Sequence, residues 1–216
     1  MVRNLRNLEE YNLYNIMIIG PKYKIARRLG ANVFEKTQNQ KFAMRKEKKG
    51  QFGKTKAKSD FGLGMLEKQK ARYSYGITSK QFGNYIRKAT EMKGNSSEHL
   101  VSLLESRLDN VALRSGFTTT RQAARQMTSH GHLTVNGKII TIPSYQVKVG
   151  DIIGIREGSK NKALFSTLDE RLKTIKIPSW LKLDFDKKTV RIDGLPTIPQ
   201  SELMFSVGSV LEFYSR

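Results

Sequence analysis

The 216-residue sequence contains no cysteine, which excludes disulfides and cysteine-ligated zinc or iron–sulfur centres. It has only three histidines, His99, His130 and His132, and no further ligand-type residues accompany them at metal-site spacing. We therefore expect no bound metal, and we expect no cofactor. No apolar run approaches the roughly 20 residues of a membrane span, and residues 16–19 are too few for a signal-peptide core. We expect no membrane partner.

Acidic residues are also scarce. The chain has 19 Asp and Glu against 39 Lys and Arg, a formal net charge of +20 and a pI near 10.2. Such a charge implies a polyanionic partner, most simply nucleic acid, and binding that weakens as salt rises. Residues 1–94 hold 22 basic and 7 acidic residues, whereas residues 95–216 hold 17 and 12. The N-terminal half should therefore depend more than the C-terminal half on contact with the polyanionic partner.

Two segments concentrate this charge. Residues 20–30 carry four basic residues between Gly-Pro and Gly, and two interpretations are open: an extended lead into a helical turn laid on phosphates, or a solvated basic tail. Residues 41–58 carry eight basic residues and one acid, with glycines that interrupt any helix. Because apolar residues there are too few for a core, we expect an irregular arm that becomes ordered only on RNA.

Helices and strands are expected on both sides of a central region, residues 98–157. The pattern predicts a turn at residues 59–62, a short helix at 66–73, and a helix at 80–93 whose apolar face is Phe82, Ile86 and Ala89. The only tryptophan, Trp180, is expected in a core. The expected elements after residue 157 are a helix at 163–173 and strands at 183–186, 189–192 and 210–214. We expect these strands to form a small sheet against the N-terminal helices.

The central region, residues 98–157, carries most of the functional information. A helix is predicted from His99 to Arg114, because leucines and a valine recur along it at helical spacing. Gly116 should end it, where a residue with positive φ is often needed. Arg107 lies at the edge of the apolar face. We expect Arg107 and Asp109 to fix the geometry between two helices without needing to pair with each other.

A second short helix should follow three threonines that offer a hydroxyl N-cap, Thr118, Thr119 and Thr120. One face would carry Ala123, Ala124 and Met127. The other face would carry Arg121, Gln122, Arg125, Thr128 and Ser129, without a single carboxylate. Such a row of donors suits phosphate oxygens. The alternative is a small α+β module whose arginines are only solvated.

A hairpin should come next. Asn136-Gly137 between two β-rich runs is a strong signal for a two-residue turn, and residues 151–155 are predicted as a closing strand. The region 98–157 closely resembles the S-four RNA-binding module. The resemblance rests on Leu-Glu-Ser-Arg-Leu-Asp at 104–109, Thr-Arg-Gln-Ala-Ala-Arg at 120–125, His-Gly at 130–131, Val-Asn-Gly at 135–137 and Gly-Asp at 150–151.

The remaining chain extends the resemblance to the bacterial-type small-subunit ribosomal protein S-four family. The motifs are Gly-Pro-Lys at 20–22, Arg-Arg-Leu-Gly at 27–30, Ser-Asp-Phe-Gly at 59–62, Lys-Gly-Asn at 93–95 and Phe-Tyr-Ser-Arg at 213–216. The sequence departs from the family at Lys-Gly-Gln-Phe-Gly, residues 49–53, where a Pro-Gly-Gln-His-Gly motif is usual. It also lacks the N-terminal cysteine cluster of some members.

The resemblance implies an α+β fold with a mostly helical N-terminal domain, a basic irregular arm, the compact module and a small C-terminal β segment. The domains would be an extension at 1–19, the arm and helical part at 20–97, the module at 98–157, and a segment at 158–216 that packs back on the helical part.

The resemblance implies a structural, non-enzymatic protein that binds a 5′-domain junction of small-subunit rRNA. It would nucleate subunit assembly and contribute to translational accuracy. Its protein partners would be ribosomal proteins S-five and S-three, close to the path by which mRNA enters. The localisation would be a cytoplasmic ribosome, with an organellar one left open. The alternatives are a pseudouridine synthase that carries the same module and a stress-related RNA binder that rescues stalled ribosomes.

The basic and hydrogen-bonding residues of these segments are the candidates for RNA contact. They are Lys22, Lys24, Arg27, Arg28, Arg45, Lys46, Lys48, Lys49, Lys54, Lys56, Lys58, Lys68, Lys70, Arg72, Arg87, Arg114, Thr118, Thr119, Thr120, Arg121, Gln122, Arg125, Ser129, His130 and Lys138.

Overall fold

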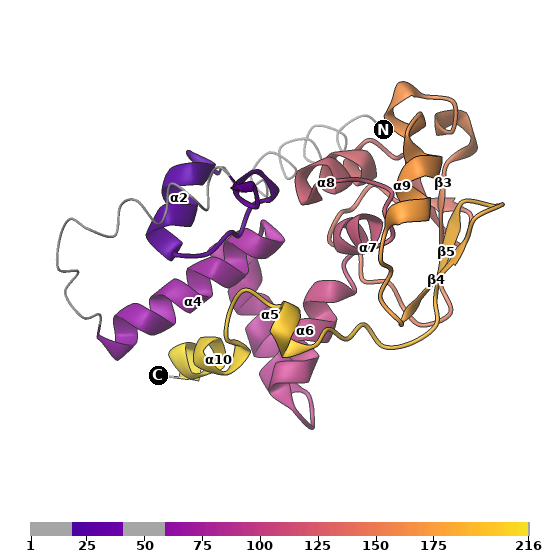
Figure 1. The fold of residues 1–216 in the computed structure, drawn as a ribbon. Helices are drawn as coiled ribbons and strands as arrows, with labels where there is room; N and C mark the ends of the chain where they lie inside the picture. Colours follow the sequence, from indigo (N-terminus) through magenta and orange to yellow (C-terminus); the bar gives the residue numbers. More distant parts are fainter. Residues whose placement is uncertain (1–18, 41–58, 216) are drawn as a thin grey trace, which may run out of the picture. The chain divides into compact units, whose positions relative to one another are not determined.

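The computed structural model of the chain describes residues 19–40 and 59–215 (Figure 1). The chain forms two compact units, one of Met1–Arg87 with Gln200–Arg216 and one of Lys88–Pro199. The contacts thus divide the chain at residues 87 and 199, and the domain bounds expected at 97 and 157 stay a prediction. Helices and an antiparallel sheet together confirm the α+β class.

The first unit is helical in its described part. Its elements are α2 (Lys22–Leu29), η1 (Glu35–Thr37), α4 (Asp60–Tyr75), most of α5 (Ser79–Glu91), η4 (Gln200–Glu202) and α10 (Val207–Ser215). Phe82, Ile86 and Ala89 are buried on α5, as predicted. Thr78 caps this helix, because its Oγ1 accepts from the Gln81 amide at 3.3 Å.

Residues 20–30 contain helix α2, where the sequence left open an extended lead into a helical turn or a solvated basic tail. The carbonyl of Pro21 starts it by accepting from the Ile25 amide at 3.1 Å, and Gly30 ends it at φ +69°. Ile25, Ala26 and Leu29 are buried. The apolar residues therefore share one face. Packing of that face stabilises a complete helix in a segment rich in basic residues.

Helix α4 is twice as long as the predicted segment at 66–73. The Ser-Asp-Phe-Gly sequence at 59–62 is not a separate turn but the N-terminus of this helix. Ser59 Oγ accepts from the Gly62 amide at 3.3 Å, and Gly76 ends the helix at φ +63°.

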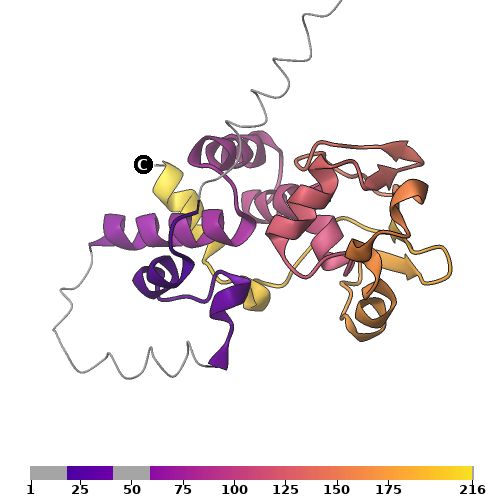
Figure 2. The same ribbon diagram turned by 90° about the horizontal axis from the view of Figure 1, so that it is seen from above.

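Residues 210–214 were predicted as a strand but belong to helix α10. Its Val207 and Val210 are buried one helical turn apart, and Ser206 Oγ caps the Ser209 amide at 3.3 Å. Figures 1 and 2 show α10 beside α4. The Phe61 and Phe213 rings lie 5.2 Å apart between these helices. Packing on α4 thus overrides the β propensity of the sequence.

The approach of α10 to α4 depends on Gly64. A Cβ placed there would lie 2.9 Å from Phe213 Cδ2 and 3.2 Å from Phe213 Cβ. We expect Gly64→Leu to destabilise α10 docking by about 1–3 kcal/mol because the added side chain overpacks the contact. Hydrogen exchange of the α10 amides measures the loss. The matched control is Gly208→Leu on α10 itself, where a Cβ meets nothing within 4 Å. Equal protection in both variants would contradict the prediction.

The second unit combines helices with one sheet. Its elements are α6 (Ser96–Glu105), α7 (Leu108–Arg114), α8 (Arg121–Ser129), β1 (Leu133–Val135), β2 (Lys138–Ile139), β3 (Ile152–Ile155), η2 (Glu157–Ser159), η3 (Ala163–Phe165), α9 (Leu168–Thr174), β4 (Leu181–Asp184) and β5 (Thr189–Ile192). The strand order is β2-β1-β3-β5-β4, with every neighbouring pair antiparallel.

Strands β4 and β5 correct the prediction of a separate C-terminal sheet. β5 pairs with β3, and Ile153 lies opposite Val190. Both side chains are fully buried, so one core continues across the pair. The predicted hairpin is confirmed: Asn136 and Gly137 both have positive φ, as a type I′ turn requires.

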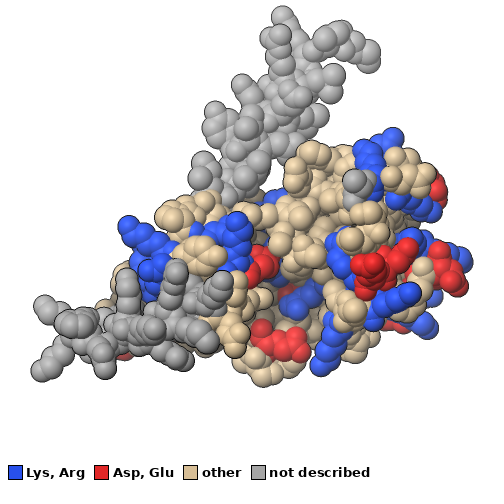
Figure 3. Space-filling view, turned by 45° about the horizontal axis from the view of Figure 1, so that its top comes forward, with Lys and Arg blue, Asp and Glu red and all other residues tan. Residues whose placement is uncertain are grey.

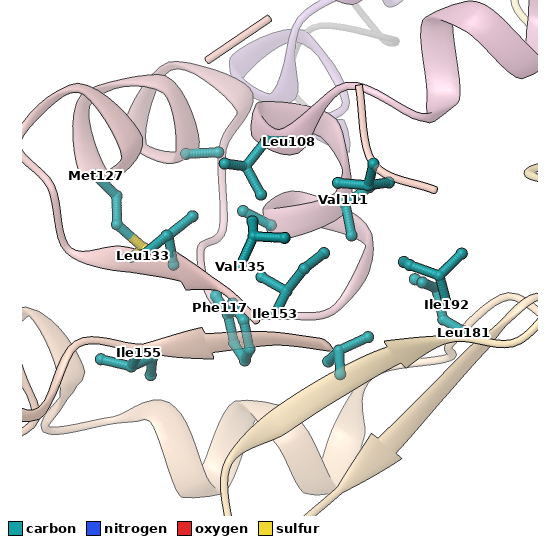
Figure 4. Close-up of a cluster of buried hydrophobic side chains, with 14 of the residues drawn as sticks. Leu108, Val111, Phe117, Met127, Leu133, Val135, Ile153, Ile155, Leu181 and Ile192 are labelled. Carbon is teal, nitrogen blue, oxygen red and sulfur yellow. The ribbon is translucent and has the colours of Figure 1, made fainter. Parts of the chain in front are cut away.

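The core of this unit lies between helices and sheet. Figure 4 shows Leu108 and Val111 of α7 and Met127 of α8 among sheet residues such as Val135 and Ile153. Trp180 is buried in the same core, as predicted.

The helix predicted over residues 99–114 is two helices, α6 and α7, broken at Arg107. Arg107 has φ −68° and ψ 136° and forms a β-bridge with Gln146. The Leu108 amide donates to the Tyr145 carbonyl at 2.9 Å, and Val147 donates to the Ser106 carbonyl at 2.8 Å. Leucine spacing alone could not predict the break, because its cause is a segment 40 residues away.

Candidate nucleic-acid interface

Helices α7 and α8 carry a buried carboxylate shared by two arginines. Asp109 is 1% exposed and accepts from Arg107 Nε at 3.0 Å and Nη2 at 2.8 Å. It also accepts from Arg125 Nε at 3.1 Å and Nη2 at 2.8 Å. Arg107 is 3% exposed and Arg125 is 21% exposed. The expectation that Arg107 and Asp109 need not pair was wrong, because the helix break at Arg107 turns its side chain back to Asp109.

The two arginines keep Asp109 ionised. Burial by itself would raise the pKa of this carboxyl, but the charges and hydrogen bonds of Arg107 and then Arg125 outweigh it and hold the pKa below its ordinary value. The trio carries one net positive charge. Arg125, the more exposed of the two arginines, is therefore fixed in position by a carboxylate that it shares with Arg107.

A second network lies beside it. Glu105 of α6 is fully buried and accepts from the amide nitrogen of Asn110 and from Arg114 Nε at 3.1 Å and Nη2 at 3.3 Å. Asn110 Oδ1 in turn accepts from Arg121 Nη2 at 2.6 Å and Nε at 3.2 Å. Arg114 remains 28% exposed. One buried carboxylate thus orients Arg114 directly and Arg121 through Asn110.

Together, these networks orient a defined set of partly exposed guanidinium groups: Arg114, Arg121 and Arg125. We call them the arginine row. The sequence placed Arg121 and Arg125 on an acid-free face of α8, and α8 itself has no acid. The carboxylates that orient the row come from α6 and α7. The role of Glu105 could therefore not be predicted from the sequence of α8 alone. Side chains already held in place lose less conformational entropy when a partner binds. The row is chemically suited to phosphate oxygens, which guanidinium groups bind with charge-assisted hydrogen bonds.

The threonines and polar residues of α8 divide into cap, core and surface. Thr120 caps the helix, as predicted, by accepting from the Ala123 amide at 3.2 Å. Thr118 is buried and donates to the Thr120 carbonyl at 3.2 Å, which leaves it facing the interior. Thr128 was predicted on the polar face but is fully buried and bonded to the Ala124 carbonyl at 2.9 Å. Thr119, Gln122 and Ser129 are exposed.

The candidate cations of the first unit have varied surroundings. Lys70 pairs with Glu67 at 2.6 Å, and Arg72 donates to Gln69 at 2.7 Å. Lys68 Nζ lies 5.1 Å from the Phe213 ring centre and 4.8 Å from that of Tyr214. Burial and the neighbouring Arg72 lower the pKa of Lys68. Lys68 therefore has a cation–π role in holding α10, which composition could not reveal.

Several other candidates are exposed: Lys24, Arg27, Arg28, Arg87, His130 and Lys138. Lys22 is partly buried. The predicted arm and its candidates Arg45, Lys46, Lys48, Lys49, Lys54, Lys56 and Lys58 lie outside the described residues. Figure 3 shows acidic side chains among the Lys and Arg side chains of the sheet-bearing unit. Position and pairing, rather than charge density, therefore distinguish the arginine row.

Residues 19–40 and 59–215 include no group of three or more His, Asp or Glu placed to hold a metal ion. In the same described part, no helix is both long and apolar enough to cross a membrane.

Comparison with known proteins places these observations in a family. Residues 17–105 match the ribosomal protein S4/S9 N-terminal domain, and residues 106–153 match the S4 domain. The small ribosomal subunit protein uS4 of Delftia acidovorans is 41% identical over 203 residues, which cover 92% of this chain and 98% of the relative. The uS4 protein of Roseiflexus castenholzii is 43% identical with the same coverage. That of Listeria monocytogenes is 40% identical over 200 residues, 91% of this chain and 98% of the relative.

These relatives are named as ribosomal proteins, which confirms the expectation of a non-enzymatic protein. Similarity that spans both units and nearly the whole length of each relative leads to one conclusion: the chain belongs to the uS4 family of small ribosomal subunit proteins.

Proposed function

We propose that this protein is a structural component of the small ribosomal subunit that binds its rRNA through phosphate and shape contacts. The observation that carries the proposal is the arginine row, whose guanidinium groups are held by buried Asp109, Asn110 and Glu105. A net charge of +20 adds long-range attraction to a polyanion. The A-form major groove is too narrow for side chains to read, so backbone and shape contacts suit such a row.

We further propose where on the rRNA the protein binds and at which stage of assembly. The protein would bind a multi-helix junction of the 5′ domain early, nucleate subunit assembly, and contribute to accuracy close to the path by which mRNA enters. Ribosomal proteins S-five and S-three would be its neighbours on a cytoplasmic ribosome. Family membership supports this proposal. RNA crosslinking with mapped sites tests it: crosslinks scattered outside the 5′ domain would contradict it.

An RNA-modifying enzyme is the rival function, and it requires an available catalytic Asp. The buried carboxylate of Asp109 accepts from two arginines. Asp151 accepts from the Lys148 amide and Asp184 from the Lys187 amide, so both hold turns. Asp169 pairs with Lys188 at 2.7 Å. These contacts favour the structural role. Formation of modified nucleotides in RNA incubated with the pure protein would support the rival.

The arginine row gives a direct prediction. Arg121→Gln should weaken rRNA binding about 10- to 150-fold, because one charge-assisted contact contributes roughly 1.5–3 kcal/mol. Stability should change little, since Arg121 pairs with the neutral Asn110 and glutamine can still donate to its Oδ1. Filter binding over a range of salt concentrations measures the effect, and the slope of log affinity against log salt should fall by about one.

The matched control is Lys182→Gln, which removes one exposed cation from β4. This strand forms one edge of the sheet, and β2 forms the opposite edge. It should leave affinity within about twofold of wild type if the row is the specific contact. Equal losses in both variants would mean that only total charge matters. An unchanged affinity for Arg121→Gln would remove the row from the interface.

A further inference from the structure

Two histidines lie in the turn between α8 and β1, and two exposed cations, Arg156 and Lys162, lie in the segment that follows β3. His130 follows α8 and His132 precedes β1, and their ring centres are 6.1 Å apart. His132 Nδ1 lies 2.9 Å from Ser159 Oγ, and its ring meets Phe165 edge-on with centres 6.3 Å apart. Ser159 is buried. The loop at residues 157–165 therefore fixes the orientation of the His132 ring.

The charges around this ring are cationic. Arg156 is tied to the same place, because its amide donates to the His132 carbonyl at 2.9 Å. Burial lowers the pKa of His132, and Lys162, His130 and Arg156 lower it further. Arg156 and Lys162 are exposed, and neither pairs with a carboxylate within the described part of the chain. The one acid of the loop, Glu157, is turned to Lys160 at 2.6 Å.

We propose that His130, His132, Arg156 and Lys162 form a phosphate-binding cluster that takes up a proton on His132 when an RNA phosphodiester binds. This inference rests on the proposed function, because it assigns the RNA contact of a second site in the same unit. A phosphate oxygen accepts from Arg156 and Lys162 and offsets the two charges that oppose protonation of the imidazole. His132 then gains a positive charge beside an anion, which strengthens the contact.

The sign of the pH effect follows from linkage. The free protein holds His132 neutral at pH 7, because its pKa lies below the ordinary value of 6.5. If the bound phosphate raises that pKa, the complex binds more protons than the free partners. Affinity is then highest at pH values below the pKa of the free protein and falls as pH rises through the pKa of the complex. A rise of one pKa unit corresponds to a change of about tenfold in affinity.

The test uses the full-length protein and its small-subunit rRNA fragment. Calorimetry near pH 6.5, in buffers of different ionisation enthalpy, should show net proton uptake on binding. His132→Gln should abolish most of this uptake, and its affinity should vary less than about twofold between pH 5.5 and 8. Uptake that persists unchanged in His132→Gln would overturn the proposal. Binding without any uptake by the wild type would overturn it equally, while leaving the proposed function intact.

Two matched controls separate the cluster from general effects. His99 lies elsewhere, with its Nε2 3.0 Å from the Lys93 carbonyl, so His99→Gln should keep the proton uptake. Lys160→Gln removes a cation from the same loop that already pairs with Glu157, and should change affinity less than Lys162→Gln.

The free protein gives a readout that needs no RNA. Lys162→Gln should raise the pKa of His132, followed by NMR of the imidazole protons, because one opposing charge is gone. An unmoved His132 titration in Lys162→Gln would mean that the cluster does not act as a unit. Failure of every variant, and of the wild type, to bind rRNA would instead reject the proposed function.

Discussion

Asp109→Ala should lower the free energy of unfolding of the unit Lys88–Pro199 by about 3–5 kcal/mol. The substitution leaves Arg107, which is 3% exposed, as a buried charge without its carboxylate. Removing one partner of a buried ion pair is more destabilising than the pair is stabilising, because the remaining charge cannot recover its hydration. Arg125 loses the same acceptor but can turn to solvent. The expected loss therefore comes mainly from Arg107.

The single tryptophan makes the measurement specific. Trp180 lies in the core of this unit, so denaturant titration followed by its fluorescence reports on this unit alone. Asp193→Ala is the control, because Asp193 pairs with Arg191 at 3.4 Å where both side chains are well exposed. Exposed pairs of this kind contribute about 0–1 kcal/mol. A loss for Asp109→Ala no larger than that of the control would reject the buried trio as a stabilising element.

The same prediction has a pH dependence. The folded-state pKa of Asp109 is depressed, so its contribution to stability is present above the pKa of the unfolded chain, about 3.9. The contribution is lost as pH falls through the folded pKa. The stability difference between wild type and Asp109→Ala should therefore be constant near neutral pH and narrow below about pH 4.

Glu105→Ala should have the second largest effect, a loss of about 3 kcal/mol. The amide nitrogen of Asn110, which is fully buried, loses its side-chain acceptor. The loss is smaller than for Asp109 because Arg114 is 28% exposed and can reach water. Glu105→Gln is the matched comparison, since it keeps an acceptor oxygen and removes only the charge. It should fall between wild type and the alanine variant.

A second readout connects Glu105 with RNA. Well below the melting temperature, Glu105→Gln should still bind rRNA more weakly than wild type, because its one remaining acceptor oxygen orients Arg114 and Asn110, and through Asn110 also Arg121, less firmly than the carboxylate does. A double-mutant cycle of Glu105→Gln with Arg114→Gln measures this coupling. If the two substitutions are additive in RNA affinity, Glu105 supports the fold without positioning the row.

The sequence predicted best where the signal was local. The Asn136-Gly137 turn, the Thr120 cap and the start of α8 depend on residues within a few positions of each other, and all were confirmed. The break at Arg107 and the helix α10 were not predictable in this way, since distant segments cause both. Residues 210–214 have strand propensity, and only the contact with α4 decides for a helix.

In the candidate site, too, local features were predicted and contacts between distant segments were not. Arg121 and Arg125 were identified from the composition of one helix face. The geometry that gives these arginines their orientation comes from Glu105, Asp109 and Asn110, which lie 11 to 20 residues earlier. The role of Lys68 was missed because its aromatic partners, Phe213 and Tyr214, follow it by more than 140 residues.

The pairing of β5 with β3 means that the region matching the S4 domain is not a self-contained building block in this chain. That match ends at residue 153, yet β3 completes its hydrogen bonding with Thr189–Ile192. A fragment that ends at residue 157 would leave β3 as an unpaired edge strand. Val190 would then no longer pack beside Ile153. Open edges of this kind pair with other chains and promote aggregation. Anyone grafting this module into another protein must carry the β4–β5 hairpin with it.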